Sequence, residues 1–226
     1  MEVLLMLLVM VLVGWSQIKV QGAYSKYAKI ANKRGLSGKE IAEQILAKNF
    51  AENVEVKMSN AGTLSDHYDP RTKSISLSPD VYQGKSIAAA AVAAHECGHA
   101  IQYQSKYAGI GVRNAILPMA IISGYVGWTV VSIGLFMYFS GGGSFILFIG
   151  LALIAVIAVF QLITLPIELN ASSRALTILQ EENFILNDEV ADAKKMLDAA
   201  AFTYLAALLA TVLQILRVLT MIRRRD

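Results

Sequence analysis

Two of the three histidines in this 226-residue chain lie in the stretch AAHECGHAIQ, residues 93–102. On a helix, His95 and His99 are four residues apart, so they share one face from which both imidazoles can reach a single ion. Glu96 lies about 100° further round the helix, close enough to meet a water molecule on that ion without binding the ion itself. The spacing therefore indicates two metal ligands and a general base.

The alternative is a structural helix in which both imidazoles are satisfied by backbone carbonyls. Burying a His-Glu-His group without a strong partner costs on the order of several kcal/mol, and buried apolar helices usually contain no such group. The HExxH pattern on a helix is the arrangement of zinc peptidases, in which zinc lowers the pKa of its water to about 7. We therefore interpret the stretch as a zinc site.

The elements that must position this site include membrane helices. The chain is 55% hydrophobic and 16% charged, with a mean hydropathy of +0.51, which is typical of a protein that uses lipid as part of its solvent. Four apolar stretches are long enough, or nearly so, to cross a hydrocarbon core of about 30 Å. They are 3–18, 115–139, 144–167 and 199–216. The first lacks a basic flank and a clear cleavage site, so it is interpreted as a retained anchor rather than a signal peptide.

Charge and cysteine content limit the location and the partners. Segment 19–114 holds 13 Lys and Arg residues and segment 168–198 holds 3, whereas the turn at 140–143 holds none. The positive-inside rule then predicts a multi-pass protein of the cell membrane with its catalytic side in the cytoplasm. The basic C-terminus disagrees with this orientation, because a fourth span would place it outside the cell. Either the last helix lies in the membrane interface, or the orientation is weakly specified. The single cysteine excludes an intrachain disulfide and a four-thiolate zinc site, and the scattered basic residues give nucleic-acid binding no support.

The polar stretch before the central spans predicts a small α+β domain. Ser37 and Glu40 fit a capping box at the start of a helix. Alternating residues at 54–59 and 74–78 predict strands, with a hairpin over 63–78 turning at Pro70, and together a small antiparallel sheet. The alanine-rich helix with the histidines then begins at Ser86, and its small side chains would let a second helix approach closely.

A catalytic zinc needs a third protein ligand and an open position for water. His67 is one candidate and the carboxylates of the chain are others. Glu168 is the best of them because it directly follows an apolar span, at the membrane surface and on the same side as His95. The prediction is one Zn²⁺ per chain, bound by side chains that are far apart in the sequence.

These residues carry a resemblance to known families. HExxH, two spans and then Glu-x-x-Ala-x-x-x-Ala look like the order in HtpX-type membrane metallopeptidases. More closely, nearly the whole chain resembles the YugP-like membrane zinc metallopeptidases. The matching stretches are the N-terminal anchor, RGLSGKEIAEQIL, LSDHYDPRTKSISLS, VAAHECGHAIQ, TLPIELNASSRAL and DAAAFTYLAALLATVLQILR. The resemblance implies a peptidase in which His95, His99 and Glu168 hold zinc and Glu96 is the base.

The resulting fold class is a mainly α membrane protein with a small α+β zincin-like metallopeptidase domain and about four transmembrane or membrane-associated helices. Its expected segments are an N-terminal anchor (1–18), a soluble zincin-like domain with the HExxH helix (19–114), a two-helix transmembrane hairpin (115–167), a helical segment carrying the third ligand (168–198) and a C-terminal membrane helix (199–226).

Further site residues are expected around the metal. Ser172 stands where the HtpX pattern has an Asp that orients a ligand histidine, and Asn170 stands where YugP-like chains usually have an acid, so both are expected to offer oxygens behind the ligands. His67, Tyr68 or Arg174 is expected to stabilise the oxyanion. In related zinc peptidases an exposed strand beside the catalytic helix pairs with substrate, and we expect Ser74, Ile75, Ser76, Leu77 and Ser78 to form that strand.

The expected function is that of an integral membrane zinc endopeptidase. Its expected partners are peptide, protein or membrane-protein substrates and the lipid bilayer, and the sequence leaves open an oligomer or a regulatory membrane partner. The alternative is a non-catalytic scaffold or adaptor with a closed structural zinc site. A fourth protein ligand, for which His67 is the candidate, would favour the alternative because catalytic zinc keeps an exchangeable position.

Overall fold

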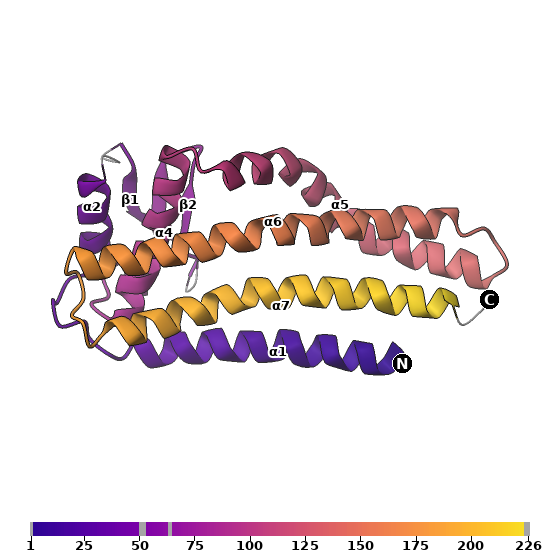
Figure 1. The fold of residues 1–226 in the computed structure, drawn as a ribbon, viewed down its shortest axis with the longest axis horizontal. Helices are drawn as coiled ribbons and strands as arrows, with labels where there is room; N and C mark the ends of the chain where they lie inside the picture. Colours follow the sequence, from indigo (N-terminus) through magenta and orange to yellow (C-terminus); the bar gives the residue numbers. More distant parts are fainter. Residues whose placement is uncertain (1, 50–52, 63–64, 224–226) are drawn as a thin grey trace. The chain divides into compact units, whose positions relative to one another are not determined.

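The computed structural model describes residues 2–49, 53–62 and 65–223 (Figure 1). Its elements, in chain order, are α1 (Glu2–Tyr27), α2 (Gly38–Lys48), β1 (Glu55–Met58), β2 (His67–Asp69), β3 (Ser74–Leu77), α3 (Pro79–Tyr82), α4 (Ile87–Gln104), α5 (Ala108–Phe139), α6 (Phe145–Glu181) and α7 (Val190–Arg223).

Four of these helices, α1, α5, α6 and α7, are long and apolar enough to cross a membrane. In their most apolar windows at most 17% of the residues are buried, so most apolar side chains point outward, as lipid-facing side chains do. The expected fold class is confirmed: this is a mainly α membrane protein with a small α+β region. The helices also continue beyond the apolar runs. α6 extends from its span through residues 168–181, which mix polar and apolar side chains and form the polar end of α6.

The chain divides into two compact units, each built from separate segments. The first comprises Met1–Ser16, Gly111–Pro166 and Thr203–Asp226, and the second comprises Gln17–Ile110 and Ile167–Phe202. The polar end of α6, including Glu168, therefore belongs to the same unit as α4 and the strands.

Within the first unit, small residues bring α5 and α6 close together. A Cβ on Gly134 would lie 2.5 Å from the backbone of Leu147, and one on Gly150 would lie 2.6 Å from the backbone nitrogen of Val131. Glycine at such positions allows the close helix contacts that stabilise membrane bundles. The turn between the two helices uses Gly141 at φ +89°, a left-handed conformation that glycine adopts without steric cost.

Within the second unit, the three strands form a mixed sheet in the order β1-β3-β2. The hairpin prediction is confirmed because β2 pairs antiparallel with β3, His67 opposite Ser76. The prediction that the whole sheet is antiparallel is wrong, because β1 pairs parallel with β3. After β1 the chain forms β2 at the far edge of the sheet and then returns as the middle strand, β3. The segment that joins β1 to β3 therefore includes β2 and is long enough for the two to pair in parallel.

The core of this unit joins α2, α4, the sheet and the polar end of α6. The capping box at the start of α2 is confirmed: Ser37 accepts from the Glu40 amide, and Glu40 accepts from the Ser37 amide at 2.7 Å. α4 packs against the sheet (Figure 1) and buries all of its alanines. A Cβ on Gly98 would lie 2.7 Å from the Ala171 carbonyl oxygen, so α4 and α6 meet at the close approach expected from the small side chains.

Candidate metal centre

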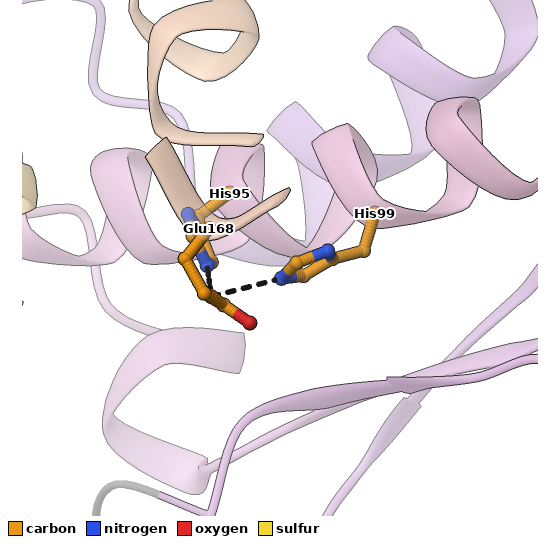
Figure 2. Close-up of side chains that lie close together, drawn as sticks. All are labelled: His95, His99 and Glu168. Carbon is orange, nitrogen blue, oxygen red and sulfur yellow. Dashed lines mark ion pairs between the residues drawn. The ribbon is translucent and has the colours of Figure 1, made fainter. Parts of the chain in front are cut away.

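Three potential metal ligands come together between α4 and the polar end of α6. Among the described residues, His95, His99 and Glu168 form a group whose ligand atoms all lie within 4.8 Å of one another. Figure 2 shows both imidazoles directed at one oxygen of the Glu168 carboxylate, while its other oxygen points away. Two turns of one helix supply the imidazoles, and a residue 69 positions after His99 supplies the carboxylate.

The spacing of these atoms fits a metal ion better than a hydrogen-bonded cluster. The Nε2 atoms of His95 and His99 each lie 3.4 Å from Glu168 Oε2, longer than the roughly 2.7–3.2 Å of an N–H···O hydrogen bond. A tetrahedral zinc with bonds of about 2.0–2.1 Å would hold its ligand atoms about 3.3–3.4 Å apart. The two imidazoles and the carboxylate are also ligand types that zinc accepts, so the residues present fit the ion.

The burial of the Glu168 carboxylate gives further evidence for a bound cation. Glu168 is 7% exposed, and its Oε2 has no hydrogen-bond partner within the described residues. A buried carboxylate oxygen that accepts no hydrogen bond has lost its hydration without full compensation, and the two imidazole nitrogens 3.4 Å away are too far to restore it. A cation between the three side chains would remove this cost, which is the strongest indication from the structure that the group is a metal site.

Gln102, which the sequence analysis did not single out, orients His99. It is fully buried; its Nε2 donates to the Ile167 carbonyl at 2.9 Å and to Asn170 Oδ1 at 3.0 Å, while its Oε1 lies 3.0 Å from His99 Nδ1. Because the Ile167 carbonyl can only accept, the amide nitrogen must face it, and Oε1 must face the imidazole. His99 therefore donates from Nδ1 and directs its Nε2 lone pair at Glu168. The only signal in the sequence was a glutamine three residues after His99, on a neighbouring part of the same helix.

Ser172 and Asn170, which were expected to offer oxygens to the ligand histidines, both make hydrogen bonds at the site. Ser172 Oγ lies 3.2 Å from His95 Nδ1 and can accept a hydrogen bond from it, so a hydroxyl stands where the HtpX pattern has a carboxylate. Asn170 reaches the site indirectly, through Gln102. Arg174 donates from Nε to Asn170 Oδ1 at 2.8 Å, so its guanidinium contacts the site only through Asn170 among the hydrogen bonds described.

Replacing Gln102 by Leu should weaken zinc binding about 10- to 100-fold, the usual cost of losing an outer partner of a ligand histidine. The substitution leaves the His99 Nδ1 proton without its partner. Asn170→Asp is the matched comparison, because it keeps an acceptor for Gln102 and should bind zinc nearly as the wild type does. Competition with a fluorescent zinc chelator measures the zinc dissociation constant of each variant and of the wild type. Equal affinities for Gln102→Leu and the wild type would contradict the orienting role.

Glu96 lies on α4 between the two histidines and is 8% exposed. It is not part of the group of ligand atoms. Burial by itself lowers the pKa of His99, but the facing Glu168 carboxylate, the nearby Glu96 carboxylate and the contact with Gln102 outweigh it and raise that pKa. Protons therefore compete with a metal for His99 at higher pH than for an ordinary histidine.

His67 and Tyr68 lie on β2, outside the three-ligand group. His67 is exposed, and its Nδ1 lies 2.8 Å from the Ser65 carbonyl, to which it can donate. Tyr68 is half-buried against Tyr103 of α4, with ring centroids 5.5 Å apart. Burial, together with the nearby Tyr103 and Asp69, raises the pKa of Tyr68, so its hydroxyl stays protonated at neutral pH.

The expectation that residues 74–78 form an exposed substrate-binding strand is wrong. β3 is the middle strand, paired with β1 on one side and β2 on the other. Ser74, Ile75, Ser76 and Leu77 are buried, and so is Ser78, whose amide donates to Asp66. The sequence showed two alternating stretches but not their spatial order, and a central strand has no free backbone edge to offer a peptide.

Comparison with known proteins agrees with the chemistry of these residues. Residues 2–223 match a family described as "Putative neutral zinc metallopeptidase". The chain is also 40% identical over 213 residues to "Putative membrane protease YugP" of Bacillus subtilis (strain 168), a match that covers 94% of this chain and 92% of that protein. No solved structure matches the chain.

Proposed function

Because the chain belongs to the family described as "Putative neutral zinc metallopeptidase", we propose that it is a zinc-dependent endopeptidase of the cell membrane. In this proposal His95, His99 and Glu168 hold one zinc ion per chain and Glu96 is the general base. The observation that carries it is the buried Oε2 of Glu168, which has no hydrogen-bond partner among the described residues and lies at equal distances from two histidine nitrogens.

Zinc bound there would supply Lewis acidity, which polarises a peptide carbonyl and makes water easier to deprotonate. The chain's own residues supply the rest. Ser172 and Gln102 hold the imidazoles with Nε2 facing the third ligand. The Glu96 carboxylate takes a proton from the attacking water at one of its oxygens and later delivers it to the leaving amine nitrogen.

The ligand set favours catalysis over the scaffold alternative. Within the described part of the chain, the group contains three protein ligands, and His67 is not among them. Zinc prefers four ligands, and three protein ligands leave a position that water or substrate can occupy. A closed structural site would need a fourth side chain.

For extended substrates, we propose pairing with the outer edge of β2. This strand lies at an edge of the sheet, and it packs against α4. Addition of a peptide to a sheet edge would let one chain hydrogen-bond with the strand while its carbonyl reaches the metal. This assignment replaces β3, which has no free edge.

The function is tested by removing and restoring the metal in the full chain purified in detergent. We expect about one zinc per chain, slow cleavage of unfolded casein, loss of cleavage with 1,10-phenanthroline, and recovery when zinc is added back. Elemental analysis measures the zinc content, and gel electrophoresis measures the cleavage of casein. Zinc content near one with no cleavage of any peptide substrate would favour the scaffold instead.

We also propose that the metal centre faces the cytoplasm, because most basic residues outside the apolar spans lie in the unit that carries it. The single native cysteine, Cys97, is buried and burial raises its thiol pKa, so it gives little background labelling. The exposed Lys57→Cys should react with a membrane-impermeant maleimide only in opened cells, and labelling in intact cells would reverse the orientation.

A further inference from the structure

A hollow of about 310 Å³ lies beside the proposed catalytic helix. Its walls include Tyr68, Pro70 and Lys73 of the β2–β3 hairpin, and Ala100, Tyr103 and Gln104 of α4. The volume is sufficient for one amino-acid side chain. Nothing in the mechanism proposed above uses this space.

The hollow lies along the face of α4 that carries Glu96. Ala100 and Gln104 follow Glu96 at intervals of four residues, so the three share one stripe of the helix. Four residues advance a helix by about 6 Å, whereas an extended peptide advances by about 3.3 Å per residue. A substrate whose reacting carbonyl lies near Glu96 would therefore reach the hollow with a side chain about two residues away.

The lining of the hollow favours an anion. Lys73 is the one charged residue among the described residues that line it, and no carboxylate lines it. Within the described part of the chain, Lys73 forms no ion pair. Its backbone is fixed, because its carbonyl accepts from the Glu55 amide at 3.0 Å. Tyr68 also lines the hollow, and its side chain carries a hydroxyl, a neutral hydrogen-bond donor.

We propose that this hollow is a substrate pocket that selects an acidic side chain, Asp or Glu, within about two residues of the bond that is cut. Lys73 is its specificity-determining residue, pairing with the substrate carboxylate while the tyrosine rings pack against the aliphatic part of the side chain. The inference rests on the proposed peptidase function and names the class of sequence that it cleaves.

The test uses the zinc-loaded full chain in detergent and a peptide library with acetylated and amidated ends, with cleavage sites identified by mass spectrometry. We expect Asp and Glu to be enriched at one position near the cut bond. In a matched peptide set, Glu at that position should give a kcat/KM about fivefold higher than Lys, a ratio on the scale of a partly exposed ion pair. Lys73→Glu should reverse the preference.

Lys57→Glu is the matched control, because Lys57 is an exposed lysine on β1 that does not line the hollow. It should keep the wild-type preference. Equal cleavage of the Glu and Lys peptides by the wild type, or an unchanged preference in Lys73→Glu, would overturn the pocket while leaving the peptidase proposal standing. The same peptides with free C-termini are measured as well, and a preference that appears only with them would mean that the site binds a terminal carboxylate, which also overturns the pocket. Cleavage of no peptide at all would contradict the peptidase function itself.

Discussion

Glu96→Gln is expected to abolish peptide cleavage and to leave zinc bound. The amide has nearly the same shape as the carboxylate but cannot accept a proton from water. Loss of a general base usually lowers the rate by about 10²- to 10⁴-fold. Because Glu96 lies outside the group of ligand atoms, the ligands of the metal stay in place. Cleavage of a fixed peptide and elemental zinc analysis on the same preparation give both values.

A matched control separates this effect from general damage to the unit. Glu43→Gln changes an exposed glutamate on α2, away from the ligand group, and should keep wild-type activity and zinc content. Glu96→Asp keeps the charge but shortens the side chain, so partial activity is expected. If Glu96→Gln cleaved peptide at the wild-type rate, the proton acceptor would have to be another group.

Glu168→Gln is expected to remove zinc binding. The substitution takes the negative charge from the one carboxylate that faces both imidazoles, and it leaves two histidines as the only strong ligands in the described group. The affinity should fall by more than the about 10- to 100-fold that the loss of an outer partner costs. Zinc content after dialysis against a weak chelator should therefore be near zero.

Thermal unfolding in detergent distinguishes a lost ligand from a misfolded chain. Zinc that binds only the folded wild type raises its unfolding temperature, and this rise should disappear in Glu168→Gln. The metal-free variant should still unfold in one cooperative transition, because the substitution removes a ligand and no packed apolar side chain. Glu181→Gln, an exposed glutamate on the same helix, should behave like the wild type. Zinc bound by Glu168→Gln at wild-type affinity would require a different third ligand.

Features that depend on neighbouring residues could be predicted from the sequence alone. The apolar runs predict the four long helices, because a helix in lipid needs only its own residues to satisfy its backbone. Ser37 and Glu40 predict the start of α2 because both partners of the capping box lie within one turn. The spacing of His95 and His99 likewise places both imidazoles on one face of α4 before any tertiary contact is known.

Features that depend on contacts between distant segments needed the tertiary structure. The strand order, which puts β3 in the middle and β2 at the edge, follows from how the segments pack and not from their alternation. Gln102 resembles any other polar helix residue until the Ile167 carbonyl is found beside it. The hollow around Lys73 arises only where the hairpin meets α4. The sequence by itself determined the chemical groups and the helices that carry them, because those signals act over a few residues. That Glu168 faces both Nε2 atoms and Ser172 faces His95 was decided by packing between segments about 70 residues apart, for which a single sequence holds no local signal.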